Sequence, residues 1–388
     1  MTRKVWVWAL LGALGWTLVY ADRAVFGPLL APIGRTFSVG PAALGVLTAA
    51  FFASYTLLQI PAGVLADRRS PRLLLALSFL GFGGAVALSA AAPSFIILVA
   101  MVFISGAFQS VYYPAQYAVT ARAVPRPLRD RATAIVNGGM GIGVAIGFGV
   151  GAAPFFLGHW QLLVAIAGVV TVAAAVPFLL VAPKEAAQGG GRPGPVPFTR
   201  DLMLLCVANF GSLFGFFFFL TWFPYYLETT ARLSGGLLSG LSAVAPLISA
   251  PAGVLWTRLL GERRLLGIRV FLPAAALALA VVPFIHSPLL LFIPLIVYGL
   301  VGKLPTDPLI LGETASRLPA ESLGAGFGIL NFAGMMASIA APAVSGLLAE
   351  RSHDLGAAFL VSAGLLVLAL VATLGLSRPG PQSSPAET

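Results

Sequence analysis

The chain has 388 residues, of which 59% are hydrophobic and only 9% are charged. Soluble domains carry roughly a quarter charged residues, so this composition excludes an ordinary soluble fold and indicates a polytopic membrane protein. The formal net charge of +10 does not indicate a nucleic-acid partner, because Lys and Arg gather at alternate ends of apolar stretches.

Apolar stretches of roughly 20 residues, the length that crosses the hydrocarbon core of a bilayer, recur along the whole chain. The alternation of polar and apolar residues that marks an outer-membrane barrel is missing, so we expect an all-α membrane protein. The first stretch is too long for the core of a signal peptide and is interpreted as a helix. Twelve transmembrane helices are predicted, over residues 5–33, 40–66, 73–92, 95–122, 130–157, 160–182, 202–227, 236–259, 265–285, 288–316, 321–348 and 356–377.

The distribution of positive charge predicts the orientation of these helices. Most Lys and Arg residues lie at one set of span ends, whereas the loops at the other set hold only Arg35, Arg232 and Arg351. Cytoplasmic loops are enriched in Lys and Arg, so we expect a multi-pass protein of the cell (inner) membrane with both termini in the cytoplasm. The single cysteine, Cys206, lies inside an apolar stretch and is expected to be a buried thiol.

Two sequence strings recur half a chain apart. PAGVLADRR at 61–69 returns as PAGVLWTR at 251–258, and IVN at 135–137 returns as ILN at 329–331. Two matches in nearly the same register predict a duplicated polypeptide with two pseudo-symmetric six-helix halves.

The expected domain boundaries follow from this duplication. A Gly- and Pro-rich stretch lies at its midpoint and has the composition of a flexible cytoplasmic linker. The last residues, rich in Pro and Ser, are expected to be disordered. The predicted division is an N-terminal bundle over 1–182, a linker over 183–200, a C-terminal bundle over 201–377 and a tail over 378–388.

Span 5 carries a stripe of glycines at every fourth position. Residues four apart share one face of a helix, so this stripe predicts close approach of another helix backbone rather than a ligand site. The stripe consists of Gly139, Gly143, Gly147 and Gly151.

Arg23 lies near the middle of span 1 and is preceded by Asp22. A charged side chain at this depth costs at least about 2.5–3.5 kcal/mol on insertion scales, so it is expected to face a cavity and to have a function. We favour a guanidinium that binds the carboxylate of a substrate through paired hydrogen bonds. The alternative is a structural ion pair with an acid on a neighbouring helix, since adjacent helical residues such as Asp22 and Arg23 diverge.

Lys303 lies near the middle of span 10, with Asp307 one turn further on. Gly302, Pro305 and Pro308 in this span are expected to break or kink the helix and free backbone groups beside Lys303. Lys303 is therefore either a second positive contact for a substrate or the partner of an i,i+4 pair that neutralises both charges. Asp22, Asp307 and Glu313 are the acidic residues near the membrane, and hence the candidates for proton coupling.

Polar side chains at helical spacing mark two further spans. In span 4, Gln109, Tyr113, Gln116 and Thr120 fall on one face of a continuous helix, which favours a water-filled cavity over a helix–helix contact. Tyr55, with Gln59 one turn on, gives span 2 a similar pair. Asn209 and Asn331 are instead expected to form hydrogen bonds between helices. The predicted substrate-binding set is Arg23, Lys303, Gln109, Tyr113, Gln116 and Tyr55.

A cluster of charge follows span 2 and returns in the next loop on the same side. An acid among bases, as at position 67, suggests an ion-pair network that holds this side shut, although plain positive-inside charge explains the arginines equally well. The predicted cytoplasmic gate consists of Gly63, Asp67, Arg68, Arg129 and Arg131.

The pattern Gly63-x-x-x-Asp67-Arg68 after span 2, together with two six-helix halves, resembles the major facilitator superfamily (MFS) over residues 5–377. Within it, four strings resemble the anion:cation symporter family: YADR at 20–23, QIPAG at 59–63, YYPA at 112–115 and TWFPYYL at 221–227.

This resemblance implies the MFS fold and transport of organic anions such as sugar acids, sialic-type acids and aromatic or dicarboxylic acids, often with protons. Family members often carry an acidic residue near the position of Gln109, and this chain has none there.

Motifs of other protein classes are missing from the sequence. It contains no nucleotide-binding loop, no Cys/His cluster with metal spacing and no nucleophile elbow, so we expect neither an enzyme nor a metal or other cofactor. The predicted function is secondary active transport of a small organic anion by rocking of the two halves, with a proton or a counter-anion as the coupled ion. We expect a monomer in the lipid bilayer. The alternatives are proton-driven efflux of amphipathic drugs, suggested by the aromatic residues of span 7, and a transport-incompetent membrane sensor.

Overall fold

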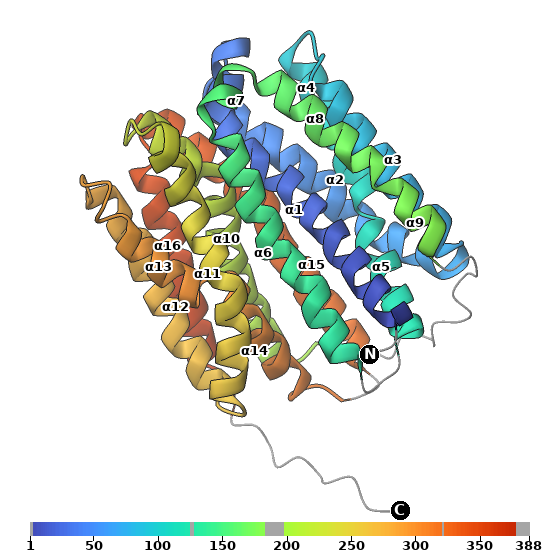
Figure 1. The fold of residues 1–388 in the computed structure, drawn as a ribbon. Coiled ribbons are helices and arrows are strands. Elements are labelled where there is room, and N and C mark those ends of the chain that lie inside the picture. Colours follow the sequence, from blue (N-terminus) through green and yellow to red (C-terminus); the bar gives the residue numbers. More distant parts are fainter. Residues whose placement is uncertain (1–2, 125–127, 183–197, 320–321, 378–388) are drawn as a thin grey trace, which may run out of the picture.

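The computed structural model describes residues 3–124, 128–182, 198–319 and 322–377, and within these ranges its regular structure is entirely helical. Figure 1 shows two helix bundles side by side, one from each half of the chain. The predicted linker and tail lie almost wholly outside the described residues, so the domain boundaries remain a prediction.

The N-terminal half contains six crossings, two of which are built from two helices each. Pro41, Pro71 and Pro154 start helices at positions where a missing N–H group costs nothing. The helices are α1 (Arg3–Phe37), α2 (Pro41–Arg68), α3 (Pro71–Ser89), α4 (Phe95–Gln109), α5 (Tyr112–Ala123), α6 (Arg129–Gly151), the short α7 (Pro154–Gly158), α8 (Trp160–Ala173) and α9 (Ala175–Val181).

The C-terminal half repeats this plan. Its first helix is capped by Thr199, whose hydroxyl accepts a hydrogen bond from the backbone N–H of Leu202. The helices are α10 (Arg200–Thr229), α11 (Gly235–Leu260), α12 (Arg264–Val281) with the 3₁₀ turn η2 (Val282–Phe284), α13 (Phe292–Val301), α14 (Lys303–Ala315), α15 (Leu323–Ser352) and α16 (Gly356–Leu374).

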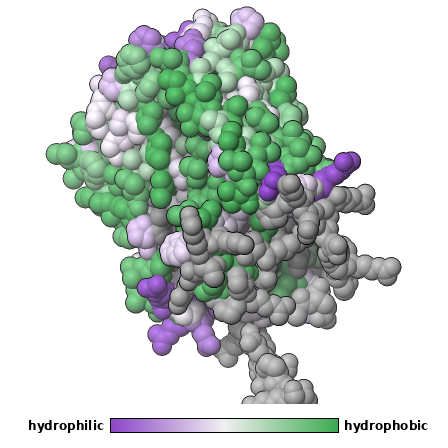
Figure 2. All heavy atoms as spheres, turned by 45° about the vertical axis from the view of Figure 1, so that its right-hand side comes forward, coloured by the Kyte–Doolittle hydropathy of each residue, from purple (hydrophilic) through white to green (hydrophobic). Residues whose placement is uncertain are grey.

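The described helices confirm the twelve predicted crossings. Eleven helices or helix pairs are long and apolar enough to cross a membrane, and the twelfth crossing is α6, whose apolar part covers 135–151. Figure 2 shows a mostly hydrophobic outer face with hydrophilic residues gathered towards its ends. This distribution is the one that a bilayer imposes on a helical bundle.

Three crossings are broken in the described part of the chain, and each break lies three or four residues before a proline. Proline lacks an N–H group and clashes with the carbonyl group four residues earlier, so the helix tends to end there. Pro305 accounts for the break at Gly302, which the sequence predicts. Pro114 and Pro177 account for the breaks after Gln109 and Ala173, which it does not.

The two halves meet through helices that the duplication relates to one another. Helix α2 packs on α15, α6 packs on α11, and α1 packs on α10. The repeated strings lie on α2 and α11 and on α6 and α15, so the first two contacts are equivalent under the pseudo-symmetry. The substrate path of a two-half transporter lies between such helices.

The halves are tightly joined at the end opposite to the start of α1 and the end of α16. A Cβ atom on Gly27 would lie 2.7 Å from the carbonyl oxygen of Leu220. A Cβ atom on Gly45 would overlap the carbonyl oxygen of Pro342. Two polar contacts lie at the same end: Arg35 pairs with Glu228 at 3.0 Å, and Glu350 accepts a hydrogen bond from the N–H of Ala42. Helix backbones therefore close this end with little space between them.

The glycine stripe of α6 packs on α1, as predicted. Cβ atoms on Gly139, Gly143 and Gly147 would overlap carbonyl oxygens of α1 at every fourth residue, those of Ala13, Thr17 and Ala21. The stripe thus fixes the position of α1, the helix that carries Arg23.

We expect Gly143→Ala to destabilise the protein by about 1–3 kcal/mol, because the new methyl group has to displace the backbone of α1. Gly149→Ala is the matched control: it lies on the same helix with nothing within 4 Å of its Cβ position, and alanine improves helix propensity there. Melting of the detergent-solubilised variants measures the difference. Equal stability of the two variants would contradict the packing.

Candidate functional site

Arg23 lies in a box of aromatic rings and a neutral amide. Its Nε donates a 2.6 Å hydrogen bond to Oε1 of Gln109 at the end of α4. The guanidinium carbon lies 4.5 Å from the ring centre of Tyr55 and 5.0 Å from that of Tyr20, with Phe51 and Phe52 within 5.8 Å. Aromatic faces attract a cation without neutralising its charge. Arg23 thus keeps a full positive charge inside the membrane-spanning region.

One end of this guanidinium has no hydrogen-bond partner. Nη2 of Arg23 is buried without an acceptor among the described residues, and the same holds for Nε2 of Gln109. Leaving a buried charged donor unpaired is costly, so such a group marks a place where a ligand or water is expected.

Asp22 forms no ion pair with Arg23 in the structure, although both residues line one hollow. Its Oδ2 accepts a 2.6 Å hydrogen bond from the hydroxyl of Thr171 on α8, inside the N-terminal half. Among the ion pairs of the described residues, none joins Asp22 to Arg23. The expectation that Asp22 is a poor partner for Arg23 is therefore confirmed.

Lys303 begins α14, directly after the break at Gly302. Its Nζ forms an ion pair with Oδ1 of Asp307 and donates a 3.0 Å hydrogen bond to Oδ1 of Asn209 on α10. Asn209 also donates to the carbonyl oxygen of Leu330 on α15, as predicted for a helix–helix contact. The lysine side chain is 6% exposed, whereas that of Asp307 is 41% exposed.

Residues of both halves come together at the centre. The carboxylate of Asp307 lies within electrostatic range of the hydroxyl groups of Tyr20 and Tyr113, although these tyrosines belong to the other half. Tyr20 in turn lies against Arg23. Of the predicted residues, the structure thus gathers Arg23, Tyr55, Gln109, Tyr113 and Asp307, with Lys303 behind Asp307.

Gln116 lies elsewhere. It is fully buried, its Nε2 donates to the hydroxyl of Thr120, and that hydroxyl also accepts a bond from Trp8 at the start of α1. Gly12, its neighbour on α1, is eleven residues from Arg23, or about 16 Å along a helix. The break after Gln109 separates the two glutamines that a continuous helix would align.

Glu313 also lies apart from the centre. It pairs with Arg317 at 2.6 Å, and Arg317 reaches Asp201 at the start of α10 at 2.5 Å. Arg317 further donates to the carbonyl oxygen of Ser377 beyond the end of α16. This ion cluster joins three chain segments of the C-terminal half at the end where α16 ends.

The predicted gate falls largely outside the description. The side chains of Asp67, Arg68, Arg129 and Arg131 are not among those that the structure describes. Gly63 is described, and nothing lies within 4 Å of its Cβ position. The gate therefore stays a prediction.

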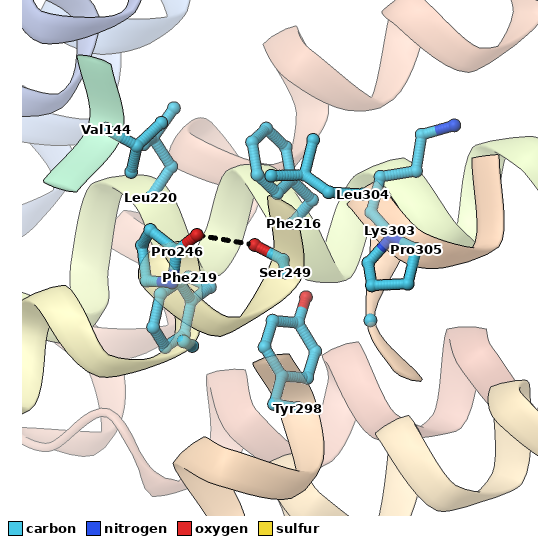
Figure 3. A pocket seen from close by; sticks show the side chains of 12 residues that line it. Val144, Phe216, Phe219, Leu220, Pro246, Ser249, Tyr298, Lys303, Leu304 and Pro305 are labelled. Carbon is cyan, nitrogen blue, oxygen red and sulfur yellow. Dashed lines mark hydrogen bonds between the residues drawn. The ribbon is translucent and has the colours of Figure 1, made fainter. Parts of the chain in front are cut away.

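Two hollows flank the central residues. One, with an empty volume of about 380 Å³, is lined by Asp22, Arg23 and Phe51 among others. The other, of about 310 Å³, lies between Phe216, Tyr298 and Lys303 (Figure 3). In Figure 3 the ammonium end of Lys303 points away from Tyr298, so the hollow meets only the aliphatic part of that side chain.

The aromatic residues of α10 are not an interfacial belt. Phe216, Phe219, Trp222 and Phe223 are buried, and the indole N–H of Trp222 donates to the carbonyl oxygen of Pro342 on α15. These four side chains therefore face the protein interior and not the lipid headgroups, where interfacial aromatic residues lie.

Sequence reasoning missed some neighbours of the charged residues. Asp22 bonds to Thr171 and Lys303 bonds to Asn209, and both partners lie on helices that are distant in the sequence. The sequence around the two charged residues does not indicate these contacts. The rings of Phe51 and Phe52 had one available signal, since Phe51 and Tyr55 share a helix face four residues apart. Among the described residues no group of three or more His, Cys, Asp or Glu side chains lies together.

The chain matches the family model of the Major Facilitator Superfamily over residues 12–342. It belongs to this superfamily. It is therefore a membrane transporter rather than an enzyme. The transporter is 24% identical to a D-galactonate transporter of Escherichia coli, with 91% of each chain covered. It is 23% identical to a hexuronate transporter of Bacillus subtilis, with 93% of this chain and 92% of the relative covered.

Solved structures confirm the fold. A bacterial homologue of the human lysosomal transporter Spinster superposes with a TM-score of 0.75 at 16% identity, and 96% of each chain is covered. A nucleoside transporter reaches a TM-score of 0.77 at 14% identity, with 95% of this chain and 99% of that chain covered. At such identities the likeness concerns the fold alone.

We expect Arg317→Met to destabilise the transporter by about 3–5 kcal/mol, because it leaves two partly or fully buried carboxylates without a cation. Arg35→Met is the matched control: it also breaks an ion pair, but the arginine is 63% exposed, so the cost is near 1 kcal/mol. Thermal melting in detergent measures both losses. A larger loss in Arg35→Met would contradict the structural role of the cluster.

Proposed function

We propose that this transporter carries a small organic anion and that Arg23 binds its carboxylate. The observation that carries the proposal is a partly buried guanidinium with a neutral hydrogen-bond partner, aromatic neighbours and a buried Nη2 that has no acceptor among the described residues. An anion is the ligand that satisfies both the charge and the free donor. The galactonate and hexuronate transporters named above give independent support for the anionic class.

The pocket uses the residues that surround Arg23. Tyr55, Gln109 and Tyr113 supply hydroxyl and amide groups beside the guanidinium, and Lys303 takes part through its ion pair with Asp307. Gln116 acts indirectly in this scheme, by holding α5 against α1.

Transport proceeds by rocking of two rigid units, residues 1–182 and 201–377, about this site. Helix backbones in close contact at one end, and the glycine stripe between α1 and α6, support units that move as wholes. We place the transporter in the inner membrane as a monomer with both termini cytoplasmic, and the gate of Gly63, Asp67, Arg68, Arg129 and Arg131 on that side. The predominance of Lys and Arg at this side supports the orientation.

The coupled ion is a proton or a second anion. Asp22 and Asp307 are the carboxyl groups nearest the site, whereas Glu313 is engaged by Arg317. Because Gln109 is an amide and carries no charge, it leaves the guanidinium of Arg23 available to an anion. This property suits anion exchange as well as symport with protons.

Arg23→Gln is expected to weaken binding of D-galactonate or D-glucuronate by about 30-fold to several thousand-fold, since truncating one partner of a buried charge pair costs about 2–5 kcal/mol. Arg23→Lys keeps the charge but loses the planar fork, and should bind with intermediate affinity. Equilibrium binding to the purified protein, followed by counterflow in proteoliposomes, measures the effect.

The same variants separate the proposal from drug efflux, which the buried aromatic residues of α10 and the apolar hollow beside Tyr298 would suit. A drug pocket would keep its affinity for an amphipathic dye in Arg23→Gln. Unchanged anion affinity in that variant, with dye binding intact, would favour efflux and refute anion transport.

A further inference from the structure

Lys303 and Asp307 differ in what they present to the centre of the transporter. The ammonium group is surrounded by two acceptors, Oδ1 of Asp307 and Oδ1 of Asn209, and its side chain is 6% exposed. The carboxylate of Asp307 is 41% exposed and lies within electrostatic range of Tyr20 and Tyr113 across the interface. A solute at the centre therefore meets the negative member of the pair first.

The two halves contribute unequal charge to the site. The N-terminal half contributes Arg23, which donates a hydrogen bond to a neutral amide and forms no ion pair among the described residues. The C-terminal half contributes a positive and a negative charge that cancel. Asp22, the remaining charged group lining these hollows, is bonded to Thr171 and lies in the N-terminal half.

We infer that Asp307 determines how many negative charges the substrate carries, by admitting an anion with one carboxylate and opposing a second. The inference rests on the proposed function of Arg23. A monocarboxylate pairs with the guanidinium and leaves the Lys303–Asp307 pair intact. A dicarboxylate places its second charge near the exposed carboxylate of Asp307 or has to break that pair to reach Lys303.

The hollow that meets the aliphatic part of Lys303 agrees with an uncharged far end of the substrate. The hollow beside Lys303 is lined by Phe216, Phe219 and Tyr298, and the hydroxyl of Ser249 in its wall already donates to the carbonyl oxygen of Pro246 (Figure 3). A second carboxylate finds no free cation in this wall among the described residues. Apolar and hydroxylated groups fit it at lower cost.

Two pairs of probes test the inference, each sharing one carbon skeleton: D-gluconate with D-glucarate, and benzoate with terephthalate. The measured quantity is the ratio of the two affinities within each pair, which cancels any general loss of folded protein. Two like charges about 6 Å apart at an effective dielectric constant near 20 alter affinity on the order of tenfold to a hundredfold. The wild type is expected to favour the monoanion by that margin.

The variants alter the charge of the site one step at a time. Asp307→Asn frees Lys303 and should raise the relative affinity for the dianion at least about tenfold. Lys303→Gln leaves Asp307 unpaired and should weaken the binding of both anions, with the larger loss for the dianion. The double variant Lys303→Gln with Asp307→Asn removes both the opposing carboxylate and the freed cation, so its preference should lie between those of the wild type and Asp307→Asn. Asp22 is unchanged in all four proteins, so its protonation does not affect the comparison.

The outcomes separate this inference from the function on which it rests. If Asp307→Asn leaves both ratios within about twofold of the wild type while Arg23→Gln loses anion binding, the selectivity role is wrong and anion transport stands. If the wild type prefers the dianion, the selectivity role is also wrong. If the wild type binds no member of either pair, or if Arg23→Gln binds them normally, the anion site itself is wrong.

Discussion

The contact between the guanidinium of Arg23 and the amide of Gln109 is the interaction on which the site depends. A carboxylate in place of the amide would neutralise the arginine, and an apolar residue would leave its Nε unbonded. The amide satisfies one donor and keeps the charge, while the rings of Tyr20 and Tyr55 stabilise that charge without removing it. The cost of a cation in the membrane is thus met in part by the protein, and the remainder is available for binding an anion.

This arrangement requires α1 to lie at a fixed position relative to α2 and α4. Helix α1 is held on its other side by the glycine stripe of α6, whose members lack the Cβ atoms that would push the two backbones apart. Close contact of small residues is the usual means of joining helices in a bilayer, because lipid chains give little hydrophobic drive for association. The position of Arg23 is therefore set by the packing of small residues that carry no reactive group. Because α1 also packs on α10, Arg23 lies at the boundary between the two halves.

The sequence predicts the twelve crossings well, because the bilayer permits few alternatives to a long apolar helix. It also predicts the break at Gly302, where glycine and proline coincide. It does not predict the break after Gln109, since many prolines of this chain, such as Pro61 and Pro342, lie within unbroken helices. Whether a proline ends a helix depends on what its neighbours offer the freed carbonyl group, and at Val301 the hydroxyl of Thr306 bonds to it. Because the break after Gln109 is not predicted, helical periodicity places Gln116 on the same face as Gln109, whereas in the structure the two residues lie on separate helices.

The charged residues themselves were visible in the sequence, but their partners were not. Lys303 and Asp307 are four residues apart and could be paired on a helix face, whereas Asn209 and Thr171 come from other helices and only the tertiary fold brings them in. These partners determine which of the charged residues are neutralised inside the protein and which stay available to a substrate. The two halves descend from a duplication and share a helix plan, yet one leaves its cation open and the other cancels its cation with an exposed carboxylate. Since backbone and lipid constrain both halves alike, the difference between them is confined to a few polar side chains at the centre. A transporter of this fold changes its substrate most readily there, because exchanging those side chains leaves the helix packing unaltered.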